Sequence, residues 1–305
     1  MAYVSAWLKR HEPAAFTCAL LNSQPLGFYS ASDLVQDARR HGVEVLPVAV
    51  NQSDWDHALV TVAGQTDSVC AGIRLGFRLV KGLSRVGAEK LLAAREQGLF
   101  RHLPDLLQRS AINRKDQTAL AAAGALEEIA GNRHKVHWAL LEEPLVSGDL
   151  LAGCTPDEAV SEVRAPAEGE LLVADYHSLG LSLGRHPLAL LRTRLQALRT
   201  ITAADWKQAG DGRWARLGGL VKQRQRPGSA KGVIFMTLED ETGMINLIVW
   251  PKVVERYQKM ILAGQLLVVN GVTQQHAGVT HLIAQKIEDY SSLLGRLPTS
   301  SRDFH

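Results

Sequence analysis

The sequence predicts a multidomain α+β protein, with helices in its first two thirds and a small β-barrel near its carboxyl end. Three observations predict this. Apolar residues recur at helical spacing through much of the chain up to residue 198. From Trp214 onward they fall into short runs separated by turn residues, which is typical of strands. Two basic stretches flank an acidic one, which indicates separate modules.

Length and composition set broad limits on function. A chain of 305 residues can form two or three domains with substantial cores. Its net charge of +3 is too small to argue for a nucleic-acid partner. Cys18, Cys70 and Cys154 are far apart and lack metal-ligand spacing, so we expect no disulfide framework and a reducing cytoplasm. Residues 1–10 do not form a signal peptide and no run could span a membrane, so we expect no membrane partner.

The distribution of charge is more informative than its sum. Basic residues outnumber acids between residues 72 and 135, where they include Arg74, Arg78, Lys81, Arg85, Lys90, Arg95, Arg101, Arg109, Arg114 and Lys115. The balance reverses between residues 136 and 177, whose acids are Glu142, Glu143, Asp149, Asp157, Glu158, Glu162, Glu168, Glu170 and Asp175. Basic residues lead again through Arg226. This predicts two basic modules joined by an acidic connector.

The first helices are predicted within residues 2–23, where Pro13 fits the first position of a second helix. A further helix over residues 30–41 begins at Ser30 or Ser32, either of which can cap it. The apolar stripes expected to face the core are Val4, Trp7 and Leu8, then Phe16, Ala19 and Leu20. The first helix starts at Met1 without a cap, so we expect another segment to precede it in a longer protein.

Short strands are predicted at residues 43–46 and 69–75, with a turn at residues 51–55 between them. Pro47 ends the first strand. The second strand brings the chain to the basic stretch.

Residues 80–100 have the pattern of a helix-hairpin-helix. One helix ends at Lys81, Gly82 gives the turn its backbone freedom, and a second helix starts near Ser84. A helix N-terminus exposes N–H groups and its dipole favours an anion, so we expect this turn to hold a nucleic-acid phosphate. The alternative is a plain helix–helix corner, because Ser84 stands where a second glycine is commoner. The predicted contact residues are Lys81, Gly82, Leu83, Ser84, Arg85, Gly87 and Lys90.

Two short helices follow, over residues 103–108 and 114–123, the second capped by Asn113. They can form a second, degenerate hairpin packed on the first. The alanines of residues 119–125 favour close helix packing over contact with a ligand.

The connector is predicted to contain a helix over residues 136–143 and a linker with little structure over residues 147–170. A turn at residues 179–184 then leads to His186 and Pro187, which open another helix.

The last third predicts three strands, a helix and two strands, which is the order of an OB-fold barrel. The strands are expected at residues 216–226, 233–238, 244–250, 266–272 and 281–288, and the helix at residues 252–262. OB-folds bind ligands on their second and third strands and the adjoining loops. The predicted contacts are Lys222, Arg224, Arg226, Lys231, Phe235 and Trp250, with Gln274, Gln275 and His276 across the groove. The aromatics, with Trp214, can stack on unpaired bases, or can instead fill the barrel.

The sequence gives little support for a catalytic site, a metal site or a clamp-binding motif. The chain lacks a P-loop, a serine nucleophile elbow and a His–Cys cluster. Asp54 and Asp56 are better explained as turn or cap residues than as metal ligands, and the acids of residues 239–241 as hairpin-turn residues. His134 and His137 fit a solvated helix face. Residues 258–262 (QKMIL) formally match the pentapeptide that binds a sliding clamp, but they lie on the predicted barrel helix.

Several stretches together point to a family: AYVSAWLKRH (residues 2–11), ALLNS (19–23), GVEVLP (42–47), IRLGFRLVKG (73–82), AAAGAL (121–126), GLSL (180–183), FMTLEDETG (235–243), VWP (249–251) and SRDFH (301–305). In this order they resemble the carboxy-terminal portion of C-family bacterial DNA polymerases, the family of the DNA polymerase III alpha subunit. The last stretch resembles the end of the error-prone branch.

The resemblance implies an error-prone DNA-directed DNA polymerase, used in damage tolerance and translesion synthesis. It places the palm aspartates and their magnesium upstream of Met1, so no residue here is assigned a catalytic role and an isolated chain is expected to be inactive. It implies DNA as partner, both duplex and single-stranded template, with a sliding clamp or other mutagenesis proteins as indirect partners. A free-standing DNA-binding accessory module is the alternative.

Pattern and resemblance divide the chain into five parts. They are the end of a fingers-like region (1–68), a helix-hairpin-helix domain (69–135), an acidic linker with a connector helix (136–205), an OB-fold domain (206–290) and a tail (291–305).

Overall fold

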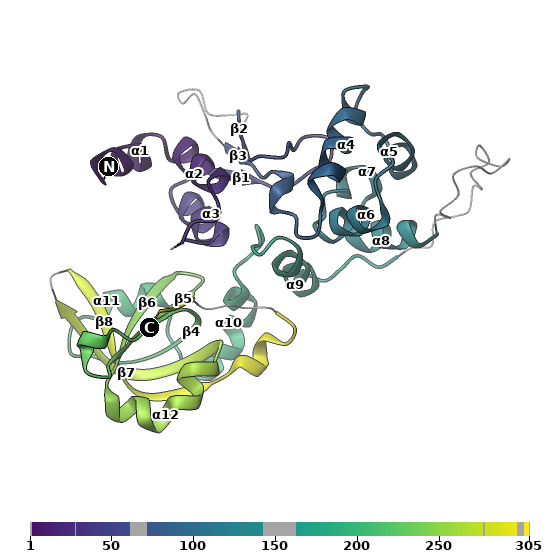
Figure 1. Ribbon diagram of the computed structural model, residues 1–305. Helices are drawn as coiled ribbons and strands as arrows, with labels where there is room; N and C mark the ends of the chain where they lie inside the picture. The colour runs from purple at the N-terminus through teal and green to yellow at the C-terminus, as the bar shows by residue number, and fades with distance from the viewer. Residues whose placement is uncertain are drawn as a thin grey trace. The chain divides into compact units, whose positions relative to one another are not determined.

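The computed structural model describes residues 2–27, 29–61, 72–142, 163–276, 278–297 and 302–304 (Figure 1). The chain divides into two compact units, Met1–Leu183 and Gly184–His305. The predicted strand residues 69–71 and most of the predicted linker lie outside the described residues. Among the described residues, no helix has both the length and the apolar character needed to cross a bilayer.

The first unit is mainly helical, with a small sheet near its middle (Figure 1). Its elements are α1 (Ala2–His11), α2 (Pro13–Asn22), α3 (Ala31–Arg40), β1 (Glu44–Leu46), β2 (Ala58–Val60), β3 (Gly72–Arg74), the 3₁₀ turn η1 (Phe77–Leu79), α4 (Arg85–Arg95), α5 (Leu103–Ser110), α6 (Arg114–Ala122), α7 (Glu127–Ala130), α8 (Arg133–Glu142) and α9 (Glu168–Ser178).

The first three helices form as predicted, with Pro13 at the start of α2. Ser30 caps α3, accepting a hydrogen bond from the Asp33 N–H at 3.1 Å. The predicted apolar stripe of α2 is wrong: the buried face consists of Ala14, Thr17, Cys18 and Leu21, and Ala19 is exposed. Apolar residues lie all around this helix, so periodicity alone could not select its inner face. The predicted stripe of α1 is wrong as well, since Val4 and Trp7 are exposed.

The small sheet has the strand order β1-β3-β2, with β1 parallel and β2 antiparallel to β3. The chain leaves β3 through η1 and enters the hairpin turn. The helix predicted to end at Lys81 is therefore wrong, because only the three-residue turn η1 precedes it. Val80 is already extended and Gly82 has φ +89°, which ends helical geometry there.

The core of this unit joins the sheet to the helices. Ile73, Phe77, Leu91, Leu106 and Leu120 are fully buried in one cluster. Burial of each such side chain contributes about 1.5–3 kcal/mol, so the sheet, the hairpin and α4 to α6 are held as one body.

The helix α9 is missing from the sequence-based prediction, which extends the unstructured linker to residue 170. Its first turn carries Glu168 and Glu170, and the Glu170 carboxylate accepts a hydrogen bond from the Ala167 N–H at 2.7 Å. Acids at a helix N-terminus are stabilising. In the prediction they were counted as part of an acidic linker.

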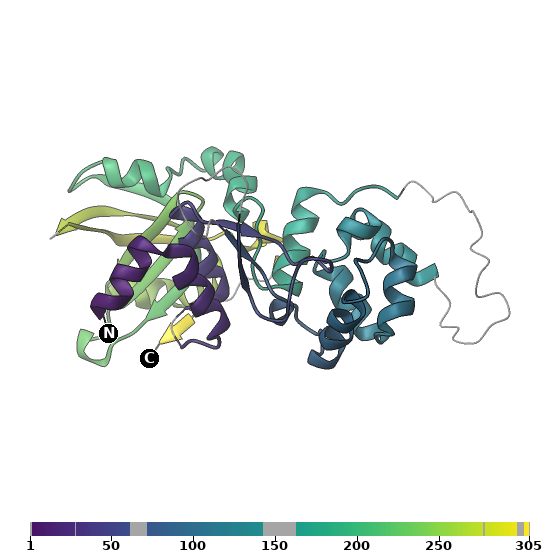
Figure 2. The same ribbon diagram turned by 90° about the horizontal axis from the view of Figure 1, so that it is seen from above.

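The second unit contains α10 (Pro187–Ala197), α11 (Ala203–Gln208), β4 (Trp214–Gln225), η2 (Gly228–Ala230), β5 (Ile234–Asp240), β6 (Gly243–Val249), α12 (Pro251–Ala263), β7 (Leu266–His276), β8 (Val279–Asp289), η3 (Ser291–Leu294) and β9 (Arg302–Phe304). Strands β4 to β8 follow the predicted order and close into a barrel, since β4 pairs with both β7 and β5. Figure 2 shows the green to yellow strands of this unit from above. The predicted OB-fold is confirmed. The short β9 adds a parallel strand beside Gln223–Gln225 of β4.

A buried aromatic and a buried ion-pair group fix α10 and α11 on the barrel. Trp206 of α11 is fully buried and its indole N–H donates to the Thr273 hydroxyl at 2.8 Å. Arg192 of α10 pairs with Glu241 and with buried Asp240. Asp240 also accepts the N–H groups of Thr242 at 2.7 Å and Ala203 at 2.8 Å, so the predicted turn acid has an additional structural role.

Candidate nucleic-acid interface

The hairpin turn depends on the backbone conformation of Gly82 and on the buried side chain of Leu83. Gly82 has φ +89°, in the region that favours glycine, and Leu83 is buried in the core cluster behind the turn. Helix α4 then begins at Arg85 with Ser84 as its N-cap, whose hydroxyl accepts the Gly87 N–H at 2.9 Å.

A carboxylate from another helix lies against this cap. The Asp116 side chain of α6 is buried and accepts two hydrogen bonds from Ser84, one from its N–H at 2.7 Å and one from its hydroxyl at 2.8 Å. Asn113 donates to the same carboxylate at 2.8 Å. A Cβ on Gly87 would come within 2.3 Å of the Asp116 Oδ2 atom. Sequence analysis missed Asp116; the only signal was its place three residues after the cap Asn113.

The outer side of the same helix end is open and basic. Lys81, Arg85 and Lys90 are exposed, and the described residues offer no hydrogen-bond partner for the N–H groups of Arg85 and Val86. The Lys81 ammonium lies 3.1 Å from the Tyr176 carbonyl, and Arg85 pairs with Glu89 at 3.1 Å and covers the Trp55 ring. Lys90 reaches the Ala111 carbonyl at 3.4 Å. Exposed pairs of this kind are weak, so these cations can turn to an anionic ligand.

Other basic residues of the stretch are structural. Arg95 donates to the Ser53 carbonyl at 2.6 Å and pairs with Asp54, and Arg78 pairs with Asp56 at 2.7 Å. Both aspartates are thus engaged by arginines. No group of three or more His, Cys, Asp or Glu residues that could hold a metal occurs among the described residues.

In the barrel, Arg224 does not line a groove as predicted. Its side chain is buried and donates to the carbonyls of Ile261 and Gly264, at the carboxyl end of α12. The reason is a β-bulge between Val221 and Gln223, which changes the alternation of β4 so that Arg224 faces the same side as buried Met236.

Lys222 also has an interior partner. Its ammonium lies 3.3 Å from the Glu239 carboxylate, which is almost fully buried and also lies 3.8 Å from His186. Burial disfavours the charged carboxylate, but the nearby His186 and Lys222 prevail and hold the pKa of Glu239 below its usual value. Lys222 therefore supports the barrel rather than an open groove.

The remaining four predicted residues come together at one end of the barrel. Gln225 pairs with Phe235 across β4 and β5, so Arg226 begins the loop beside that ring. Ile234 pairs with Val249, the residue before Trp250, and the loop returns past Lys231 close to Pro251. Arg226 and Lys231 are exposed, as are Phe235 (37%) and Trp250 (52%).

The idea that these aromatics fill the barrel is wrong, because Phe235, Trp250 and Trp214 are all exposed, whereas Trp206 of α11 is fully buried in the core of this unit. Cross-strand partners share a face of a sheet. Phe235, Ile248 and Ile283 therefore form an apolar row across β5, β6 and β8, beside a polar row of Thr237, Asn246 and His281. These rows, with the exposed Gln274 and His276 at the end of β7, offer base-stacking and hydrogen-bonding groups on one barrel surface, whereas Gln275 lies on the opposite face of that strand.

The clamp-like pentapeptide is part of α12, and its Ile261 is fully buried. Met260, the residue before it, is 36% exposed. Presentation of this segment to another protein would require the helix to leave the barrel.

Comparison with known proteins agrees with this arrangement. Residues 42–136 match the family of the helix-hairpin-helix motif, and residues 215–290 match the OB-fold nucleic acid binding domain. The whole chain is 52% identical to an error-prone DNA polymerase of Alkalilimnicola ehrlichii, and 49% identical to those of Dechloromonas aromatica and Ralstonia pickettii. This chain is similar over its whole length to the carboxy-terminal part of the error-prone DNA polymerases.

The chain spans about 29% of the length of these error-prone polymerases. Among solved structures, the asparaginyl-tRNA synthetase of Pyrococcus horikoshii aligns with 30% of this chain and 22% of its own, at 26% identity and a TM-score of 0.27. That similarity is too limited to add to the argument.

Proposed function

We propose that this chain is the template-handling portion of an error-prone DNA-directed DNA polymerase. The observation that carries the proposal is the match of the entire chain to error-prone polymerases, together with two open basic surfaces on two nucleic-acid-binding domains. The proposal extends to synthesis across damaged template and DNA repair, in the bacterial cytoplasm. It assigns magnesium and the catalytic aspartates to the part of the relatives that this chain does not cover.

In this proposal the hairpin holds the phosphates of the duplex. Support comes from the open N-terminus of α4, where the free N–H groups of Arg85 and Val86 lie among Lys81, Arg85 and Lys90. Backbone N–H groups and cations bind phosphate without reading bases, so the contact suits DNA of any sequence.

In the same proposal, single-stranded template binds to the end of the barrel that carries the four exposed residues described above. Support comes from exposed Phe235 and Trp250 next to Arg226 and Lys231, since aromatic faces stack on unpaired bases while cations track the backbone. Duplex DNA keeps its bases stacked inside, so it gains little from such a surface.

Fluorescence anisotropy with labelled duplex and single-stranded DNA over a salt series tests this division. Lys81→Ala and Arg85→Ala should each reduce the salt slope of duplex binding by about one. Arg226→Glu with Lys231→Glu should weaken single-strand binding and leave duplex binding mostly intact. Equal losses on both DNAs would contradict the division.

The alternative function is a DNA-binding accessory module without a polymerase partner domain. Primer extension separates the two when the chain is joined to the missing portion of a close relative. The proposal expects nucleotide incorporation by the joined protein and none by this chain alone. Incorporation by this chain alone would overturn the proposal, as would a correctly folded joined protein that cannot extend a primer.

A further inference from the structure

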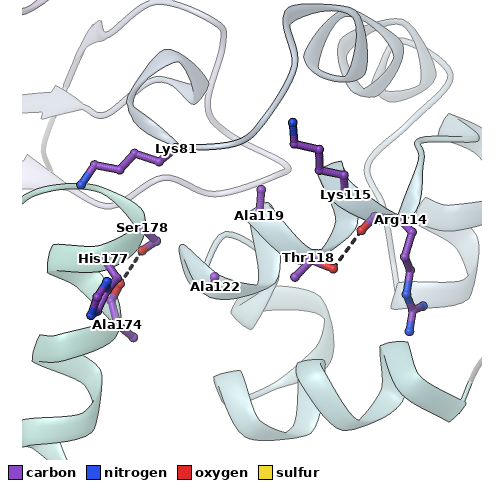
Figure 3. Close-up of a pocket in the computed structure, with 9 residues that line it drawn as sticks. All are labelled: Lys81, Arg114, Lys115, Thr118, Ala119, Ala122, Ala174, His177 and Ser178. Atoms are coloured by element: carbon purple, nitrogen blue, oxygen red, sulfur yellow. Dashed lines mark hydrogen bonds between the residues drawn. The ribbon is translucent and has the colours of Figure 1, made fainter. Parts of the chain in front are cut away.

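A hollow of about 510 Å³ lies beside the hairpin in the first unit, between α6 and α9 (Figure 3). Four basic or titratable side chains line it: Lys81 from the hairpin turn, Arg114 and Lys115 from the first turn of α6, and His177 from α9. No Asp or Glu belongs to its lining. Of the DNA-contact residues predicted from the sequence, only Lys81 lines this hollow.

The floor of the hollow is made of small side chains. Ala119 and Ala122 of α6 lie between the basic residues of the two helices (Figure 3). Methyl groups let an extended ligand approach the helix closely without displacing larger side chains. The alanines that sequence analysis assigned to packing do pack, since Ala119 is mostly buried, but Ala122 is exposed to the hollow.

Two cations of α6 occupy positions that are electrostatically unfavourable when no ligand is bound. Arg114 and Lys115 stand in the first turn of the helix, whose dipole already makes that end positive. The only acid of this turn, Asp116, is turned inward to Ser84. The described residues contain no hydrogen-bond or ion-pair partner for the charged groups of Arg114 and Lys115, so an external anion would gain from both.

We propose that this hollow is a second phosphate site, which binds the backbone of the same duplex that the hairpin holds. The inference rests on the proposed function of the hairpin. Lys81 belongs to both sites, so one strand can pass from the N-terminus of α4 into the hollow. Arg114 and Lys115 extend in opposite directions from the helix (Figure 3), which suits successive phosphates of a strand better than a single compact anion.

The test uses the full 305-residue chain and a labelled duplex in fluorescence anisotropy over a salt series. Arg114→Gln with Lys115→Gln should reduce the salt slope by about two, because each phosphate contact contributes about 0.9. The matched control is Arg39→Gln with Arg40→Gln, an exposed adjacent pair at the end of α3, whose slope should equal that of the unaltered chain. An equal reduction in the control would overturn the inference.

A second variant blocks the hollow without removing a cation. Ala122→Glu places a carboxylate on its floor at an exposed helix position and should weaken duplex binding at least tenfold more than Ala122→Gln does. Unchanged binding in all these variants, with binding still lost in Lys81→Ala and Arg85→Ala, overturns the second site and leaves the hairpin function standing. Absence of duplex binding by the unaltered chain would instead overturn the proposed function itself.

A labelled glutamate-rich peptide tests whether the hollow binds an acidic protein segment instead of DNA. The proposal expects no saturable binding of this peptide. If it binds with saturation, and Ala122→Glu removes that binding while duplex affinity stays unchanged, the hollow belongs to an acidic protein partner and the inference is overturned.

Discussion

Ser84 and Asp116 are joined by two hydrogen bonds, from the Ser84 N–H at 2.7 Å and from its hydroxyl at 2.8 Å. The serine therefore caps α4 and anchors it to α6 at once. A glycine at this position would keep the turn but lose the hydroxyl contact. Ser84 weakened the sequence-based prediction of the hairpin because a second glycine is commoner there. In the structure, this same serine connects α4 to α6.

Asp116→Asn should lower the free energy of unfolding by about 1–3 kcal/mol, because an amide nitrogen cannot accept the bonds from Ser84 and Asn113. Urea unfolding followed by circular dichroism measures this. Glu96→Gln, at the exposed C-cap residue of α4, is the comparison. Equal stability of Asp116→Asn and the unaltered chain would contradict the role given to the carboxylate.

Gly87→Ala should destabilise the hairpin although alanine is the better helix former. The new Cβ would meet the Asp116 carboxylate at 2.3 Å, so the pairing with Ser84 must shift. Gly169→Ala in the first turn of α9 is the matched control, since nothing lies within 4 Å of a Cβ there. We expect a lower melting temperature for Gly87→Ala and an unchanged or higher one for Gly169→Ala; the reverse order would refute the clash.

Arg224→Met and Arg226→Met should separate stability from binding. Loss of Arg224 leaves the carbonyls of Ile261 and Gly264 without this buried donor, at a cost of about 2–4 kcal/mol. Loss of the exposed Arg226 should change stability by less than about 0.5 kcal/mol and weaken single-strand binding. Urea unfolding and anisotropy together check this, and a stable Arg224→Met chain would contradict the buried role.

Acid should destabilise the first unit through His57. Its ring is buried and Nδ1 accepts the Gly76 N–H at 3.0 Å, so the neutral form is required. Burial and, to a lesser extent, the Arg78 charge lower its pKa to about 4, with Asp56 acting in the opposite direction. The unfolded chain binds this proton near pH 6.5, so stability is full above that pH and falls toward pH 4.

The expected loss between pH 7 and pH 5 is about 2 kcal/mol. Unfolding free energies at the two values measure it, and proton NMR of the His57 ring gives the pKa directly. His57→Gln should be less sensitive to pH across this window. A His57 ring that titrates near 6.5 in the folded chain would contradict the assignment.

The sequence pattern was sufficient to predict a helix or strand where one local signal determines it. Helices started at Pro13, Ser30 and Asn113 because caps and N1 prolines act within a few residues. The barrel strands followed from short apolar runs between turn residues. Pattern failed where a distant residue decides: Arg224 turned inward after a bulge, and α9 formed within a stretch rich in acids.

The sequence by itself determined that a helix-hairpin-helix precedes an OB-fold barrel, and which family the chain resembles. Both depend on the order of residues along the chain. Only the tertiary structure decided which cations are open to a ligand and which are paired inside, as with Arg226 and Arg224. It also brought Asp116 to Ser84 and Lys81 to Arg114 around one hollow. Charge in a sequence has no partner until folding supplies one, and burial and pairing then fix what it can bind.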